Sequence, residues 1–335
     1  MKAFVTGSTG LLGNNLVRML EAAGHTVVGL VRSEEKGHRL LGDTRAILIK
    51  GDLGDVQAFA SALEGCEAVF HTAAYFREYY QPGDHWQALE QINIRGTLTL
   101  MDEADRCGVR RFIHTSSAGT IGAKVDGSPG DEDTPAGEEQ LRNLYFRSKV
   151  EGDKRIREWR GEHGMEVIEI LPGWMWGPGD AAPTAAGRMA QDFMARKIPG
   201  ILDGGISMVD ARDVAEAMIA ALEKGRQGEK YIVAGEFHTL EEVLKGLEKA
   251  SGVAAPKLRL PFGLVLVVAF IQETIGRLTG REVLITRESV RTLHGKYRMN
   301  SAKAQRELGA RFRPLEETLK DVVAWYRSHP GAASV

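Results

Sequence analysis

The sequence has little of several features that define other kinds of protein. Two cysteines, Cys66 and Cys107, are too few for a disulfide framework and belong to no cluster of metal ligands. There is no long run of like charges, and the formal net charge is −2, which argues against a nucleic-acid surface. We therefore expect no metal site and no nucleic-acid partner.

The chain also lacks an apolar run long enough to span a bilayer. Its most hydrophobic stretch, Phe262 to Ile271, falls short of the ~20 residues that a spanning helix needs. We interpret this stretch as a buried helix of a substrate lobe and expect no membrane contact. The alternative is a helix that lies on a membrane or gates the entrance of a lipophilic substrate. Met1 and Lys2 lead straight into a strand without the regions of a signal peptide, so a cytoplasmic location is expected.

Short apolar, β-branched runs alternate with amphipathic helical segments along the chain. Strands separated by helices predict an α/β fold: a doubly wound parallel sheet, with helices on both faces. After Pro172 the pattern becomes mostly helical, which predicts a smaller C-terminal lobe. The predicted strands are 3–5, 26–31, 46–49, 68–70, 112–114, 167–171 and 231–233.

A glycine-rich turn follows the first predicted strand and opens an amphipathic helix. Residues without Cβ let backbone N–H groups approach a pyrophosphate at the helix N-terminus, and the third glycine allows helix and strand to pack closely. The turn therefore predicts dinucleotide binding, with an ordinary strand-to-helix turn as the alternative. The expected contacts are Gly7, Thr9, Gly10, Leu11, Leu12 and Gly13.

The predicted dinucleotide site and the change of pattern after Pro172 divide the chain into two expected domains. Residues 1–178 and 211–235 are predicted to form the dinucleotide-binding domain, and 179–210 and 236–330 the substrate lobe.

The end of the second strand indicates which dinucleotide is bound. An acidic residue about 20 positions past the glycines commonly holds the ribose hydroxyls, whereas a cation there accommodates a 2′-phosphate. Arg32 stands at this place and Lys36 follows one turn later, so NADP(H) is favoured over NAD(H). Alternatively, Arg32 is solvated and Glu34 or Glu35 binds the ribose. Asp52 is predicted to accept from the adenine amino group, or else to cap a helix.

Tyr145 and Lys149 are four residues apart and so share one face of a predicted helix. The ammonium and an oxidised nicotinamide favour the phenolate, which should lower a phenol pKa that is ordinarily near ~10. We predict that Tyr145 gives a proton to a substrate carbonyl oxygen. Ser117, after the fifth strand, would donate a second hydrogen bond to that oxygen. Lys149 would also hold the nicotinamide ribose.

Together these motifs resemble the extended short-chain dehydrogenase/reductases of the NAD-dependent epimerase/dehydratase superfamily, and most closely their dihydroflavonol-reductase-like branch. The resemblance runs through almost the whole chain and rests on the glycine turn, 51–53, 69–74, 93–97, 110–120, 145–149, 171–173, 177–178 and 304–309. It implies a Rossmann fold, Ser117, Tyr145 and Lys149 as the catalytic triad, and a homodimer. The further cofactor contacts that we expect are Asp52, Leu53, Thr72, Ala73, Ala74, Asn93, Thr115, Ser116, Pro172 and Gly173.

Two departures from the family pattern narrow the substrate. Gly122 stands where plant dihydroflavonol reductases carry Asn or Asp, which argues against a flavonoid. Trp174 stands where sugar-nucleotide epimerases tend to carry Asn, and an indole cannot accept a hydrogen bond. The leading hypothesis is an NADPH-dependent reductase of a medium-sized, partly apolar ketone or aldehyde. The alternatives are a nucleotide-sugar epimerase or dehydratase with tightly bound cofactor, and a non-catalytic NADP-binding regulator.

Aromatic residues follow the carboxyl ends of two predicted strands, where open α/β sheets bind ligands. They predict an apolar substrate pocket, although aromatics that join the two lobes would give the same pattern. The histidines at strand ends, His71 and His114, are expected to be packed rather than catalytic. The predicted substrate contacts are Tyr75, Phe76, Tyr79, Ser117, Gly119, Trp174 and Trp176.

Overall fold

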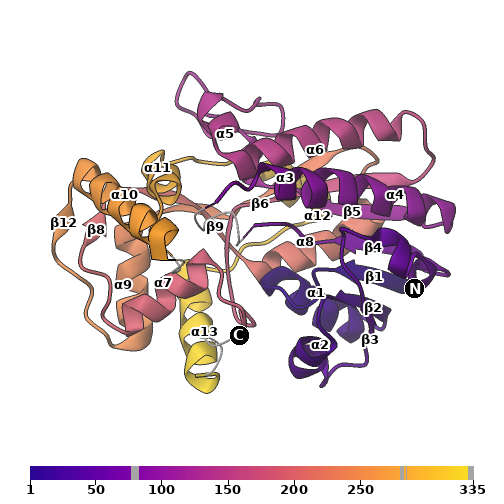
Figure 1. Ribbon diagram of the computed structural model, residues 1–335, viewed down its shortest axis with the longest axis horizontal. Coiled ribbons are helices and arrows are strands. Elements are labelled where there is room, and N and C mark those ends of the chain that lie inside the picture. The colour runs from indigo at the N-terminus through magenta and orange to yellow at the C-terminus, as the bar shows by residue number, and fades with distance from the viewer. Residues whose placement is uncertain (77–82, 280–282, 284, 331–335) are drawn as a thin grey trace.

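A central sheet of seven parallel strands organises the protein (Figure 1). The computed structural model describes residues 1–76, 83–279, 283 and 285–330. The strand order is β10-β6-β5-β4-β1-β2-β3, so the chain starts in the middle of the sheet and winds outward in both directions. The predicted doubly wound sheet and its seven strands are confirmed. The strands are β1 Lys2–Thr6, β2 Thr26–Val31, β3 Ile47–Lys50, β4 Ala68–His71, β5 Arg111–Thr115, β6 Glu166–Pro172 and β10 Lys230–Val233.

Helices cover both faces of this sheet, as Figure 1 shows. Successive side chains of a strand point to opposite faces. Phe4 of β1 accordingly packs with α4, α6 and η1, whereas its neighbour Val5 packs with α1, α8 and α12. Each apolar layer is buried, which is why the strands read as nearly continuous apolar runs. The helices are α1 Leu11–Ala22, α2 Glu34–Leu41, η1 Val56–Leu63, α3 Trp86–Leu89, η3 Glu90–Arg95, α4 Gly96–Arg106, η4 Ala118–Thr120, α5 Glu138–Arg142, α6 Leu144–Arg160, α8 Ala211–Lys224 and α12 Ala302–Leu308.

The remaining elements gather beside the carboxyl edge of the sheet and have a core of their own. Trp176, Phe193, Leu247 and Leu319 are buried together there. The assignment of residues 179–210 and 236–330 to this lobe stays a prediction. Its helices are α7 Ala185–Met194, α9 Leu240–Ser251, α10 Phe262–Thr279, α11 Arg287–His294 and α13 Leu315–Ser328. Its strands are β7 Trp174–Trp176, β8 Ile201–Leu202, β9 Gly205–Asp210, β11 Glu236–Thr239 and β12 Arg259–Leu260.

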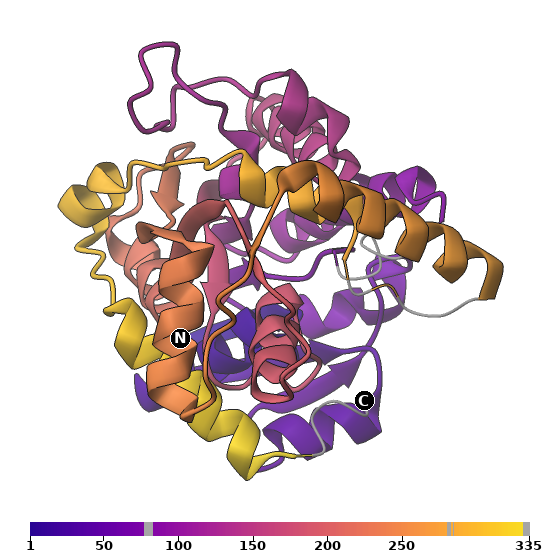
Figure 2. The same ribbon diagram turned by 90° about the vertical axis from the view of Figure 1, so that its left-hand side faces the viewer.

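Helix α10 contains the apolar stretch that was expected to be buried, and this expectation is wrong. Val265, Ala269 and Gly276 are its buried residues, while most of its other apolar side chains face solvent. Figure 2 shows the helix, in orange, lying along the outer surface. By length and composition alone, α10 could cross a membrane. A continuous apolar run has no period of its own, so the sequence could not reveal which side the fold covers.

The glycine turn between β1 and α1 has the close contacts that its sequence predicts. Gly7 has a φ of +65°, and a Cβ there would lie 2.8 Å from the backbone nitrogen of Ala73. A Cβ on Gly13 would overlap the carbonyl oxygen of Gly7. Gly10 is the N-cap of α1, and its N–H donates to the carbonyl of Gly7 at 2.9 Å. The N-terminus of α1 therefore has no side-chain cap.

We predict that Gly13→Ala lowers the free energy of unfolding by about 1–3 kcal/mol, because the added methyl meets backbone that cannot move aside. Gly164→Ala is the matched control, since a Cβ there meets nothing within 4 Å. Urea unfolding of both variants measures the difference. Equal stability of the two variants would contradict the tight contact between α1 and the turn.

Candidate active site

One buried hydrogen bond brings the three predicted catalytic residues to the same edge of the sheet. Asn143 caps α6 by accepting from the N–H of Phe146 at 3.0 Å, which places Tyr145 in the first turn and Lys149 in the next. Lys149 Nζ donates to the carbonyl oxygen of Thr115, the last residue of β5, at 2.8 Å. Ser117 follows two residues later. Helix α6 is thereby tied to the strand end that carries Ser117.

The surroundings of Ser117 and Tyr145 suit donation to a substrate oxygen. Ser117 Oγ accepts from the N–H of Gly119 at 3.0 Å, a bond that leaves the hydroxyl proton for another partner. The Tyr145 side chain is buried. Its ring and the Phe76 ring form an edge contact, with their centroids 4.8 Å apart. A Cβ on Gly119 would overlap the Phe146 ring. Gly119, predicted as a substrate contact, makes room for that ring.

Burial shifts the pKa values of both residues. It lowers the pKa of Lys149 to about 8, against the attraction of the Asp153 and Glu169 carboxylates. It raises the pKa of Tyr145, and the negative charge of Asp153 adds to this rise. The predicted lowering of the Tyr145 pKa is therefore wrong for the chain by itself, because desolvation of the phenolate and the Asp153 charge both raise it. The neutral phenol is the form that can donate a proton.

A row of polar side chains crosses the sheet beneath α6. Thr6, His71, His114 and Glu169 are register neighbours on β1, β4, β5 and β6, and each is at most 1% exposed. They share the sheet face of Phe4 and Val69, which is the face that α6 covers. The row was missed because each strand contributes one member.

His71 is packed rather than exposed to a ligand, as expected. Thr97 Oγ1 donates to the carbonyl of Asn93 at 3.0 Å, so His71 Nε2 carries the proton and donates to Thr97 Oγ1 at 2.9 Å. His71 Nδ1 then accepts from Thr6 Oγ1 at 2.8 Å. Burial, with the Lys149 ammonium as a second cause, lowers the pKa of His71 to about 3.

Three ionisable residues behind the triad, Asp153, Glu169 and Lys230, were also missed. Asp153 accepts from Ser116 Oγ at 2.8 Å and pairs with Lys230 Nζ at 3.1 Å. Glu169 is fully buried nearby, and burial raises the pKa of its carboxyl well above the usual value. Asp153 lies one turn after Lys149 on α6, and Glu169 interrupts an apolar strand run. Both signals were visible in the sequence.

The predicted cofactor residues that follow β4, and Asn93 of η3, hold backbone segments in place. Thr72 Oγ1 donates to the carbonyl of Thr6 at 2.7 Å, and the N–H of Ala73 donates to Thr6 Oγ1 at 3.2 Å. Asn93 accepts from the N–H of Tyr75 at 2.7 Å and donates to its carbonyl at 3.2 Å. Asn93 belongs to the π-helical turn η3, a form frequent at functional sites. Thr72 and Ala73 thereby lie directly against Gly7.

Beyond the end of β2, Arg32 is exposed, and Ser33 caps α2 by accepting from the N–H of Lys36 at 3.3 Å. Asp52 Oδ1 accepts from the N–H of Gly54 at 2.8 Å and so closes a turn. The alternative role of Asp52 as a helix cap is wrong, because Asp55 is the N-cap of η1. The other predicted cofactor contacts lie in the segments around the site. Leu11, Leu12 and Leu53 are buried, and Ala74 is half-buried. Pro172 ends β6, and the N–H of Gly173 donates to the carbonyl oxygen of Val233 at 3.2 Å.

The glycine turn fits a dinucleotide. Gly7 and Gly10 keep side chains away from the N-terminus of α1, and Thr72 and Ala73 line the opposite wall. A helix N-terminus with open backbone donors suits a pyrophosphate. The residues that would hold the group are therefore present at the carboxyl edge of the sheet.

The structure separates the predicted aromatic substrate residues. Tyr75 donates its hydroxyl to, or accepts from, His85 Nδ1 at 2.8 Å, whereas Tyr79 lies outside the described residues. Trp174 is half-buried and forms an edge contact with Trp176 at 5.1 Å between centroids. Trp176 itself is 1% exposed and belongs to the core of the lobe. Trp176 therefore packs inside the lobe, as the alternative to a substrate pocket predicted.

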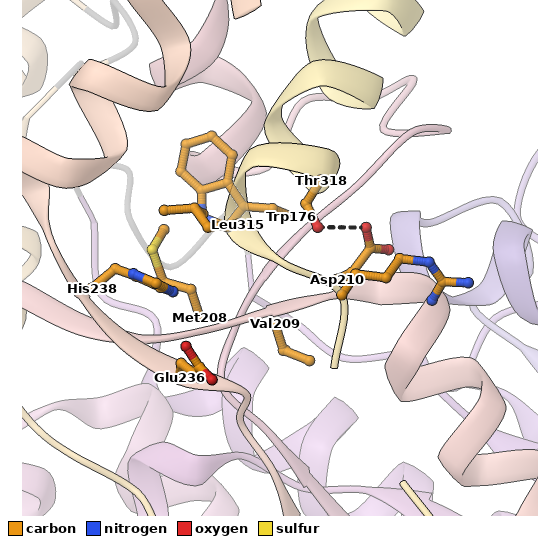
Figure 3. Close-up of a pocket in the computed structure, with 9 residues that line it drawn as sticks. Trp176, Met208, Val209, Asp210, Glu236, His238, Leu315 and Thr318 are labelled. Carbon is orange, nitrogen blue, oxygen red and sulfur yellow. Dashed lines mark hydrogen bonds between the residues drawn. The ribbon is translucent and has the colours of Figure 1, made fainter. Parts of the chain in front are cut away.

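Trp176 also lines a small pocket that contains none of the triad residues (Figure 3). Met208, Asp210, Glu236 and His238 line it too, from β9 and β11, and Asp210 accepts from Thr318 Oγ1 at 2.9 Å. This pocket lies apart from the catalytic edge.

Gly122 has no space for the polar side chain of plant dihydroflavonol reductases. Its N–H donates to the carbonyl of Pro135 at 3.1 Å, and a Cβ would overlap the same oxygen.

Comparisons with known proteins agree with this geometry. Residues 3–234 match the family described as "NAD dependent epimerase/dehydratase family". A Methylococcus capsulatus protein named "Sterol demethylase protein B" is 34% identical, with 98% of each chain covered. A Synechocystis "Putative dihydroflavonol 4-reductase" is 30% identical and covers 97% of this chain and 94% of its own. The crystal structure of a protein called gox2253 is 33% identical, with a TM-score of 0.82 and 99% of each chain covered.

The chain therefore belongs to the NAD dependent epimerase/dehydratase family. It is an NAD(P)-dependent oxidoreductase, a reductase or dehydrogenase of this family.

The buried His71 predicts a pH dependence of stability. An unfolded imidazole titrates near the ordinary pKa of 6.5, whereas folding lowers it to about 3. Between these values the unfolded chain binds a proton that the folded chain excludes, so stability falls as the pH falls. With His71→Gln, the free energy of unfolding should fall less steeply with decreasing pH, by up to about 1.4 kcal/mol per pH unit. The measurement is urea unfolding between about pH 6 and about pH 4, with His38→Gln, an exposed site, as control. Equal slopes in the two variants would contradict the burial of a neutral His71.

Proposed function

We propose that the protein is an NADPH-dependent reductase of a medium-sized, partly apolar ketone or aldehyde. The observation that carries the proposal is the position of Tyr145, one helical turn before Lys149, whose ammonium is tied to the end of β5 by its bond to Thr115. The names of the Synechocystis and Methylococcus relatives, a reductase and a protein of sterol chemistry, support a carbonyl compound with an apolar skeleton.

The chain's own residues would act on the carbonyl oxygen. When bound, the reduced dinucleotide supplies the hydride that the carbonyl carbon accepts. Tyr145 donates its phenolic proton to the oxygen, on which negative charge develops. The Ser117 hydroxyl donates a second hydrogen bond to the same oxygen and holds it in place. Lys149, fixed by Thr115, stabilises the phenolate that remains.

The charge at the end of β2 supports the preference for NADPH. Arg32 is exposed beyond the last strand residue, and Lys36 lies on the first turn of α2. Together they offer two cations to a ribose 2′-phosphate, and a guanidinium can pair with it through two hydrogen bonds.

Replacing Tyr145 by Phe tests the proton donor. We expect kcat for NADPH-dependent carbonyl reduction to fall about 10²–10⁴-fold, while NADPH binding is retained. Tyr231→Phe is the matched control, because it removes the same hydroxyl from β10, where it bonds Glu307. The readout is NADPH oxidation over a broad panel of ketones and aldehydes. Failure of the wild-type chain to oxidise NADPH with any of them would overturn the proposal.

Replacing Arg32 by Ala tests the cofactor preference. Wild-type protein should bind NADPH at least about tenfold more tightly than NADH, a difference of ~1.4 kcal/mol, and Arg32→Ala should lose that difference. Calorimetric titration of cofactor-stripped protein measures both affinities. Arg45→Ala, an exposed arginine before β3, should keep the preference. NADH binding as tight as NADPH in the wild type would rule out the proposed preference.

A further inference from the structure

Helix α10 has an inner face that fixes it to the lobe. Val265, Ala269 and Gly276 are buried on this face. Val265 and Ala269 belong to an apolar cluster with Val290, against which Trp174 also packs. Glu273 accepts from the N–H of Arg287 and pairs with its guanidinium at 2.8 Å. The helix is therefore part of the folded lobe and cannot leave it to cross a bilayer without breaking these contacts.

The opposite side, which we call the outer face of α10, is apolar and exposed. Its large side chains recur at intervals of three and four residues and so form one continuous stripe. Their exposed fractions lie between 39% and 82%. An apolar surface of this extent marks an interaction site. The members of the outer face are Leu264, Val267, Val268, Phe270, Ile271, Ile275 and Leu278.

Two exposed cations among the described residues flank α10 along the chain. Exposed Lys257 precedes the helix, and exposed Arg277 lies in its last turn. The helix contains a single acidic residue, Glu273, whose side chain is 13% exposed and paired with Arg287. Within α10 the described residues thus offer mainly apolar side chains to solvent, with Arg277 and the hydroxyls of Thr274 and Thr279, and no exposed carboxylate.

We propose that the outer face of α10 binds the surface of a lipid bilayer that contains anionic lipids, with the helix lying flat in the interface. An exposed apolar helix face with flanking cations lies on membrane surfaces in this way, and the apolar composition of α10 is compatible with lipid. Two copies of the face are a poorer match for each other, because antiparallel pairing would bring Lys257 of one close to Arg277 of the other. This proposal replaces the expectation of no membrane contact.

Membrane attachment would place the site next to an apolar phase. The inner face of α10 packs in the same cluster as Trp174, which follows Pro172 and Gly173 at the catalytic edge. A partly apolar substrate dissolved in the bilayer would therefore meet the lobe on the side of the site. Attachment itself does not depend on the proposed reaction, and it is tested without substrate.

Vesicle flotation of the full chain tests the proposal. We expect binding to vesicles of phosphatidylcholine mixed with phosphatidylglycerol, and at least a tenfold loss of the bound-to-free ratio in the triple variant Val267→Gln, Ile271→Gln, Ile275→Gln. The matched control is Ile47→Gln, Val125→Gln, Leu141→Gln, which removes three exposed apolar side chains elsewhere and should bind as wild type does. Lys257→Gln with Arg277→Gln should lose the preference for anionic over neutral vesicles.

Three outcomes would overturn the proposal: wild-type chain that floats with neither vesicle, a triple variant that binds as wild type does, and charge substitutions without effect. Sedimentation of the same proteins tests whether a second copy of the chain covers the outer face instead. In that case the wild type would be a dimer that fails to float, and the triple variant would be a monomer. Retained dinucleotide binding shows that each variant is folded. Loss of carbonyl reductase activity would leave the flotation result unchanged, so the two proposals fail separately.

Discussion

The hydrogen bond from Lys149 Nζ to the carbonyl of Thr115 is the constraint on which the site depends. It joins the second turn of α6 to the end of β5 inside the protein, where an unpaired ammonium would be very costly. Because Tyr145 lies one turn before Lys149 and Ser117 lies two residues after Thr115, this bond sets both hydroxyls at one edge. The rest of the architecture either supplies this edge or protects it from water.

Burying the lysine requires compensation, which the neighbouring polar residues provide. The Asp153 and Glu169 carboxylates favour the charged lysine, although burial still lowers its pKa to about 8. Lys230 in turn pairs with Asp153. His71 and His114 remain neutral in the same layer, because burial and the Lys149 charge both lower their pKa values. The sheet therefore carries a row of buried polar side chains beneath the catalytic residues, where most parallel sheets carry apolar ones.

Local patterns predicted the parts of the structure that local patterns control. The seven strands, the contacts of Gly7 and Gly13, and the shared helical face of Tyr145 and Lys149 all follow from spacing within one segment. The polar row was not predicted, because it exists only once β1, β4, β5 and β6 are in register. The exposure of α10 and the burial of Trp176 depend on which other elements cover them, and that information is tertiary. The raised pKa of Tyr145 likewise reflects its surroundings rather than its neighbour at i+4.

The fate of the transferred hydride tests the central claim most directly. The protein is given NADPH labelled with deuterium at C4, on the transferred side of the ring, and each member of a panel of partly apolar carbonyl compounds. The account predicts one deuterium on the carbinol carbon of the product and one NADPH consumed for each carbonyl reduced. Deuterium that returns to the cofactor, with isomerised substrate and no net NADPH consumption, would contradict it and assign the site to epimerisation.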